Sequence, residues 1–121
     1  MRDFVLVGLG GLIGSIGRFS IYAMFLKSAA EKSYLATLTV NLVGSLLIGI
    51  LVGYGSRLNS SMSVFLVSGL CGGFTTFSAF SMDGVRLLKN GLYLDFAIYS
   101  SLSMIFGLIL CGLGYILGSR L

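Results

Sequence analysis

The chain has 121 residues, of which 56% are hydrophobic and 10% are charged, and its net charge is +4. A soluble domain carries about 25% charged residues, so this composition excludes a soluble fold and indicates an integral membrane protein. The absence of histidine and the presence of only four acidic residues leave no material for a transition-metal or hydrolytic centre. We therefore predict that the protein is not an enzyme. The positive charges are scattered, form no stripe for nucleic acid, and suit loops beside anionic membrane lipid.

Four apolar runs are long enough to cross a membrane, over about 4–26, 34–55, 62–88 and 94–118. At about 1.5 Å per residue, the first run covers about 34 Å, which is sufficient for a hydrocarbon core of about 30 Å. The segments between the runs are too short to fold separately. The sequence therefore predicts one all-α transmembrane domain over residues 1–121.

The charges that flank these spans divide almost evenly between the two ends of the predicted bundle. One end holds the N-terminus, the second loop and the C-terminus, with Arg2, Arg57 and Arg120. The other end holds Lys27, Lys32, Arg86 and Lys89. The positive-inside rule then gives no clear orientation. Such a chain can insert both ways and pair as an antiparallel homodimer; the alternative is a single orientation set by a factor outside the sequence.

Pairs of glycines four residues apart recur in the spans, at Gly10/Gly14, Gly49/Gly53, Gly69/Gly73 and Gly114/Gly118. Pairs of this kind let the backbones of two membrane helices approach closely. We interpret their abundance as a sign of a tightly packed oligomer.

Arg18 is the one clear charge inside the first span. An arginine near the bilayer centre costs at least about 2.5 kcal/mol, and Arg18 lies on the same helix face as Gly14. Two interpretations remain open: a vestibule that attracts an anion, or a structural arginine that caps carbonyls or reaches the headgroups.

In the second span, Thr37, Asn41 and Ser45 recur every four residues and therefore share one helix face. A membrane asparagine often links helices, but its alignment with two hydroxyls favours a polar pathway. Tyr99 and Ser103 repeat this spacing in the fourth span and suggest a second polar track.

The third span contains the segment 72–81, with the sequence GGFTTFSAFS. Adjacent glycines together with threonines and serines make a poor continuous helix, so we predict that this span is broken in mid-membrane. Backbone groups freed there need protein, a water-lined cavity or an ion as partner. Carbonyl oxygens between Gly72 and Thr76 would suit Na⁺.

Phe77 and Phe80 in the same segment are interleaved with Ser78 and Ser81. Phenylalanine in a membrane span usually contacts lipid or packs in a core. An aromatic ring also has a positive edge, which can solvate a small anion, and serine hydroxyls can donate to one. Together with Arg18, these groups favour a pathway for anions over one for cations.

These residues together resemble the Fluc (CrcB) family of small fluoride channels over essentially the whole chain. The resemblance rests on Gly10-Gly11-x-x-Gly14-x-x-x-Arg18, on Asn41-x-x-Gly44-Ser45 and on Tyr99-x-x-x-Ser103. The string GGxTTFSxFS over 72–81 is the most specific part.

The resemblance implies a dual-topology homodimer in the cell inner membrane, with two antiparallel pores for passive fluoride efflux that lowers cytoplasmic fluoride. It implies a structural Na⁺ at the centre, held by the backbone carbonyls of Gly72 and Thr75, and a vestibule role for Arg18. It also implies pore or pore-supporting positions at Asn41, Phe77, Ser78, Phe80, Ser81, Tyr99 and Ser103. The chain departs from the family pattern at Asp83, where glutamate is more familiar, at Gly107, where a further hydroxyl is expected, and at Phe19.

Two other functions fit a small four-span protein less well. A dual-topology, proton-coupled multidrug transporter needs a membrane-embedded carboxylate, expected in the first span, whereas Asp3 lies at its edge and Asp83 lies late in the third. A non-transporting assembly subunit would not account for a string that weakens a spanning helix.

Overall fold

A computed structural model describes residues 1–28 and 33–121 of the chain, and Lys32 of the loop-charge count lies outside them. The helical elements are α1 (Arg2–Ser28), α2 (Ser33–Gly53), η2 (Gly55–Arg57), α3 (Ser60–Ser63), η3 (Val64–Cys71), α4 (Gly72–Phe74), α5 (Phe77–Lys89) and α6 (Tyr93–Arg120). Four helical stretches are long and apolar enough to cross a membrane, over Arg2–Lys27, Ser33–Gly53, Ser60–Lys89 and Tyr93–Arg120. The predicted all-α class and the four spans are therefore confirmed.

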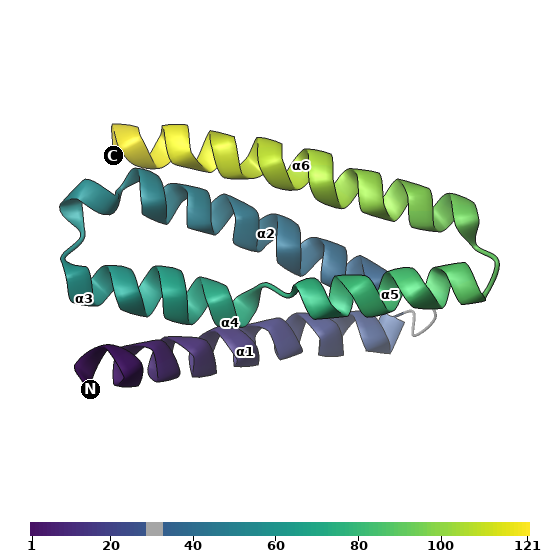
Figure 1. Ribbon diagram of the computed structural model, residues 1–121, viewed down its shortest axis with the longest axis horizontal. Coiled ribbons are helices and arrows are strands. Elements are labelled where there is room, and N and C mark those ends of the chain that lie inside the picture. The colour runs from purple at the N-terminus through teal and green to yellow at the C-terminus, as the bar shows by residue number, and fades with distance from the viewer. Residues whose placement is uncertain (29–32) are drawn as a thin grey trace.

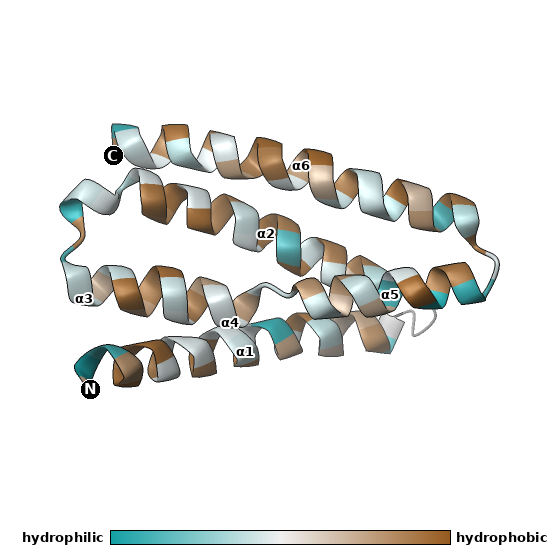
Figure 2. Ribbon diagram, viewed as in Figure 1, coloured by the Kyte–Doolittle hydropathy of each residue, from teal (hydrophilic) through white to brown (hydrophobic). Residues whose placement is uncertain are grey.

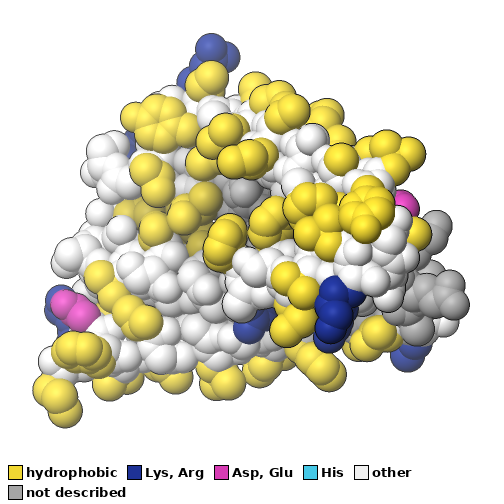
Figure 3. All heavy atoms as spheres, turned by 45° about the vertical axis from the view of Figure 1, so that its right-hand side comes forward, with side chains coloured by type: hydrophobic (Ala, Val, Ile, Leu, Met, Phe, Trp, Pro, Cys, Tyr) yellow, Lys and Arg dark blue, Asp and Glu magenta, His cyan; other side chains and the backbone are white. Residues whose placement is uncertain are grey.

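The stretches run alternately up and down, so both termini lie at the same end of the molecule (Figure 1). α1 packs mainly on η3 and α4, while α2 packs along α6, and α5 contacts α2 and α6. The hydrophobic colours of Figure 2 cover most of every long helix, which suits a surface in contact with lipid. Hydrophobic side chains likewise spread over much of the face in Figure 3.

The turn between α5 and α6 needs a glycine. Gly91 has a φ of 73°, in the left-handed region, and is the only described residue with a positive φ. Glycine adopts this conformation without a steric penalty, and it commonly ends a helix in this way. The amide of Leu92 donates to the carbonyl of Leu87 at 2.9 Å, which closes the end of α5.

The four glycine pairs pack within one chain. A Cβ atom added at any of these glycines would lie 3.0 Å or less from a backbone atom of a facing helix of the same chain. Gly10 and Gly14 face η3 and α4, whereas Gly49 faces α6. Because close approach inside the chain already uses these pairs, they give no independent support for an oligomer, which stays a prediction.

The third span is built from short pieces. η3 is a π-helix, a wider turn that often occurs at functional sites, and it was not predicted from the sequence. α4 ends at Phe74, after which Thr75 has φ −77° and ψ 158° and Thr76 has φ −154° and ψ 115°. These two extended residues separate α4 from α5, as the thin trace between them in Figure 1 shows.

The packing of α2 on α6 can be tested by comparing two glycines of α6. A Cβ at Gly114 would lie 2.4 Å from the carbonyl oxygen of Leu46, whereas a Cβ at Gly112 would meet nothing within 4 Å. We expect Gly114→Ala to destabilise the protein by about 1–3 kcal/mol through overpacking, which thermal unfolding in detergent would measure. Gly112→Ala is the control and should keep the wild-type melting temperature; equal melting of both variants would contradict this packing.

Candidate functional site

The two extended residues between α4 and α5 leave backbone groups without helical partners, and Asn41 of α2 binds one pair of them. The side-chain Nδ2 of Asn41 donates to the carbonyl of Thr76 at 3.0 Å, and its Oδ1 accepts from the amide of Thr76 at 2.9 Å. The side-chain amide of Asn41 thus pairs with both backbone groups of Thr76, as the backbone of a neighbouring strand does in a sheet. One N–H and further lone pairs of Asn41 stay available for another partner.

The threonine side chains stabilise the two helix ends. The hydroxyl of Thr75 donates to the carbonyl of Cys71 at 2.9 Å, as does its amide at 3.0 Å, which closes α4. The hydroxyl of Thr76 accepts from the amide of Ala79 at 3.2 Å and caps the N-terminus of α5. The sequence Thr-Thr therefore both ends one helix and begins the next.

A cavity of about 370 Å³ opens beside this interruption. Its walls come from α2, the interruption, α5 and α6, and its lining residues are Asn41, Ser45, Ile48, Thr75, Thr76, Phe77, Phe80, Ser103 and Met104. The structure thus brings together Asn41, Phe77, Phe80 and Ser103, which the sequence placed on three different spans. Figure 3 shows the hollowed, largely apolar surface of the protein from one side.

Aromatic rings continue from the cavity toward the end of the bundle that holds the α5–α6 turn. The centroid of Phe80 lies 5.7 Å from that of Phe77 and 5.2 Å from that of Tyr99, and Tyr34 meets Tyr99 edge-on at 5.5 Å. The hydroxyl of Tyr34 then donates to Asp95 at 3.4 Å. The exposed fraction is 79% for Phe77 but 2% for Tyr99, so the series runs from an open surface into the core.

A buried polar cluster lies beside this series. Asp83 has an exposed fraction of 6% and accepts from the hydroxyl of Thr37 at 2.5 Å, while its other oxygen lies 3.8 Å from the guanidinium of Arg86. The hydroxyls of Tyr22 and Thr37 also share a hydrogen bond, and the buried hydroxyl of Tyr99 lies beside them. The carboxylate is therefore hydrogen-bonded and charge-paired, as a buried carboxylate requires.

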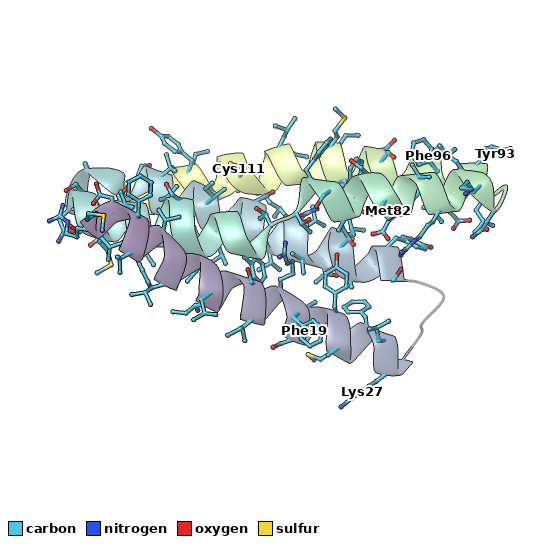
Figure 4. All side chains as sticks on the ribbon, turned by 60° about the horizontal axis from the view of Figure 1, so that its bottom comes forward. Phe19, Lys27, Met82, Tyr93, Phe96 and Cys111 are labelled. Atoms are coloured by element: carbon cyan, nitrogen blue, oxygen red, sulfur yellow. The ribbon has the colours of Figure 1, made fainter. Side chains whose placement is uncertain are left out.

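Arg18 lies on the other side of the interruption, at a second cavity of about 460 Å³. This cavity is lined by Ser15, Arg18, Phe19, Tyr22, Leu26, Thr76 and Ala79. Figure 4 shows Phe19 on α1, eight residues before Lys27, which extends away from the end of that helix. Nη1 of Arg18 donates to the carbonyl of Thr75 at 3.4 Å. Because Thr76 lines both cavities, the extended residues form a thin wall between them.

Four of the predicted site residues line neither cavity: Gly72, Ser78, Ser81 and the buried Tyr99. Ser78 and Ser81 are exposed, and the hydroxyl of Ser81 donates to the carbonyl of Phe77 at 3.0 Å. Gly72 is also exposed, and a Cβ added there would meet nothing within 4 Å. Ser103 lines the first cavity, but its hydroxyl donates to the carbonyl of Tyr99 at 2.7 Å, so donation to a solute requires rotation of that hydroxyl.

Tyr34 and Tyr22 were not among the site residues predicted from the sequence. Tyr34 precedes Asn41 by seven residues, which is two helical turns, so the spacing that found Thr37 and Ser45 also indicates Tyr34. Tyr22 follows Arg18 by four residues and lies on the same face of α1. An extension of each helix face by one more turn would have found both residues.

The fold and the site define a four-span helical membrane protein with polar and aromatic side chains gathered at an interruption of its third span. The chain matches the CrcB-like protein family, Camphor Resistance (CrcB), over residues 5–115. It is 42% identical to the fluoride-specific ion channel FluC of Methylobacillus flagellatus, with 95% of this chain and 93% of the relative covered.

Two further relatives carry the same name. The protein of Agrobacterium fabrum is 41% identical with 100% of this chain and 99% of the relative covered, and that of Flavobacterium psychrophilum is 36% identical with 100% of both covered. The chain therefore belongs to the CrcB family and is a multi-pass membrane protein. The relatives are named as channels, which confirms the prediction that it is not an enzyme.

The contact between Asn41 and Thr76 gives a testable prediction. Asn41→Leu removes both hydrogen bonds and leaves the half-buried amide and carbonyl of Thr76 without these partners, at about 1–3 kcal/mol each. We expect a lower melting temperature and faster hydrogen–deuterium exchange in a peptide that covers residues 71–80. Thr39→Val on the same helix, which removes only a bond to the carbonyl of Leu35, is the control; unchanged exchange in Asn41→Leu would contradict the role of Asn41.

Proposed function

We propose that the protein is a fluoride-selective channel that allows passive efflux and thereby lowers cytoplasmic fluoride. The observation that carries this proposal is the first cavity, where Asn41, Phe77, Phe80 and Ser103 meet beside an interrupted span. The names of the relatives support the choice of ion. In this proposal the interruption lies at mid-membrane depth, where a break is tolerated only if it lines a cavity or is buried in protein.

The lining chemistry suits a small anion that must lose water to enter. Asn41 keeps one N–H free after it has bound Thr76. The edges of Phe77 and Phe80 carry partial positive charge, so they offer weak contacts that hold an anion without trapping it. Conduction needs such binding, favourable enough for entry and weak enough for exit. Beyond them, Tyr99 and Ser103 continue the pathway, and Ser78 and Ser81 support it from the next face of α5.

A second copy of the chain would complete the pore. The first cavity is open, and its polar atoms would otherwise face lipid, which offers no hydrogen-bond partner. Phe77 is 79% exposed beside it. The nearly even charges at the two ends of the bundle permit insertion in both orientations. We therefore propose an antiparallel homodimer with two pores, each closed by the partner copy.

The backbone carbonyls of Gly72 and Thr75 fit a structural Na⁺ between the two copies. Thr75 lies in the interruption with an extended conformation, its carbonyl accepts from Arg18, and Gly72 is exposed with open space around it. Carbonyl oxygens are hard ligands of the kind that hold Na⁺ at unwound helices. A bound cation would supply fixed positive charge close to the anion route.

Fluoride flux through the purified protein in liposomes tests the function. A fluoride electrode should detect rapid release without a proton gradient, while chloride is retained. Phe80→Ile should reduce the fluoride rate by at least about tenfold, which corresponds to about 1.4 kcal/mol in the barrier, because it removes a ring edge from the route. Phe106→Ile is the matched control, since Phe106 is exposed on α6 and does not line the cavity. Equal flux in Phe80→Ile and wild type would show that the ring of Phe80 has no part in conduction. Absence of fluoride release from correctly folded wild-type protein would refute the proposed channel function.

Charge changes at the loops test the antiparallel arrangement separately. Ser56→Lys combined with Lys27→Gln and Lys89→Gln places the positive excess at one end, and Arg2→Gln combined with Arg57→Gln places it at the other. We expect each set alone to lose most fluoride flux because all copies then insert the same way. Expression of both sets together should restore the flux. Full fluoride flux with either set alone would show that chains in a single orientation conduct, which would contradict the antiparallel homodimer.

A further inference from the structure

The carbonyl oxygen of Thr75 has a second candidate partner. Nη1 of Arg18 donates to this oxygen at 3.4 Å, and it is the same oxygen that we assign to the structural cation. Arg18 is half-buried, and the ion pairs among the described residues join other groups, Arg2 with Asp3 and Arg86 with Asp83. The guanidinium therefore meets a carbonyl dipole and no carboxylate.

We propose that Arg18 and the structural cation share the carbonyl oxygen of Thr75, so that the charge of Arg18 sets the affinity of the cation site. The inference rests on the cation site of the proposed function. A carbonyl oxygen has two lone pairs and can accept from a donor while it coordinates a cation. Two positive centres on one oxygen lie within a few ångströms of each other and repel strongly in a partly buried setting.

This coupling works in both directions. If Arg18 weakens the binding of the cation, the bound cation must weaken the hold of Arg18 on Thr75 by the same factor. Arg18 lines the second cavity, which is large enough for the guanidinium to move away from the carbonyl. Occupancy of the cation site then drives the guanidinium toward that cavity, where it increases the attraction for an incoming anion.

The coupling can be tested without a flux measurement by measuring the melting temperature of the purified dimer at increasing Na⁺ concentrations. N-methyl-D-glucamine would replace Na⁺ at constant ionic strength, and the half-saturating Na⁺ concentration would be compared between variants. Arg18→Gln, and Arg18→Met as a second neutral variant, should lower this concentration at least about fivefold, the lower bound of ordinary coupling between sites. Arg18→Lys keeps the charge, so its half-saturating Na⁺ concentration should stay within about twofold of the wild-type value, which is a small difference in binding free energy. Arg120→Gln removes one positive charge from the exposed C-terminal end of α6 and should leave the half-saturating Na⁺ concentration unchanged.

Each other outcome overturns the inference in a distinguishable way. An unchanged Na⁺ midpoint in both neutral variants leaves the cation site intact and refutes the coupling. Weaker Na⁺ binding in the neutral variants and in the lysine variant would show that Arg18 supports the structure of the site and that its charge does not set the cation affinity, which refutes the coupling. No effect of Na⁺ on wild type would overturn the coupling together with the cation site, and the separate fluoride measurement would then decide whether the channel function stands.

Discussion

The bond between the side-chain amide of Asn41 and the backbone of Thr76 is the interaction on which the site depends. In a membrane, an interrupted helix is tolerated only if the freed amides and carbonyls find partners within the protein. Asn41 supplies a donor and an acceptor at 3.0 and 2.9 Å, so it fixes Thr76 in an extended conformation. That conformation sets where α5 begins, and with it the direction of the rings of Phe77 and Phe80.

Close helix packing makes this arrangement possible. Gly44 of α2 faces the interruption, and a Cβ there would lie 2.2 Å from Cγ2 of Thr75. Asn41 can reach Thr76 because the backbones at this level are separated only by small groups. The same closeness between α1 and η3, at Gly10 and Gly14, brings Arg18 one helical turn further along α1 to the level of the carbonyl of Thr75.

Much of the fold could be predicted because it follows from local composition. Apolar runs give the four spans, and the spacing of Thr37, Asn41 and Ser45 gives the polar face of α2. The glycine pairs were recognised in the sequence, but a sequence shows that a face packs closely and not which helix that face meets. Only the tertiary structure could decide between a second copy and a neighbouring helix.

The parts of the site that escaped prediction depend on contacts between distant segments. The sequence shows a hydroxyl at Ser103, but not that it donates to the carbonyl of Tyr99. Asp83 stands out in the sequence as a lone acid late in the third span, yet its hydrogen bond with Thr37 forms only because α2 and α5 meet. The π-helix η3 has no local signature that we recognise in the sequence, and it packs against the distant helix α1.

In the proposed channel, the interruption gives an apolar bundle a way to attract an anion without a buried lysine. Breaking a helix frees groups of both polarities, amides and carbonyls, and Asn41 neutralises one pair of them at Thr76. The carbonyl of Thr75 remains, and it accepts from the guanidinium of Arg18. A neutral backbone oxygen therefore holds positive charge at the interruption. In the proposed pathway, an anion that passes Phe77 and Phe80 would be attracted by this charge at a distance and would meet only weak contacts on its way, which is the combination that conduction requires.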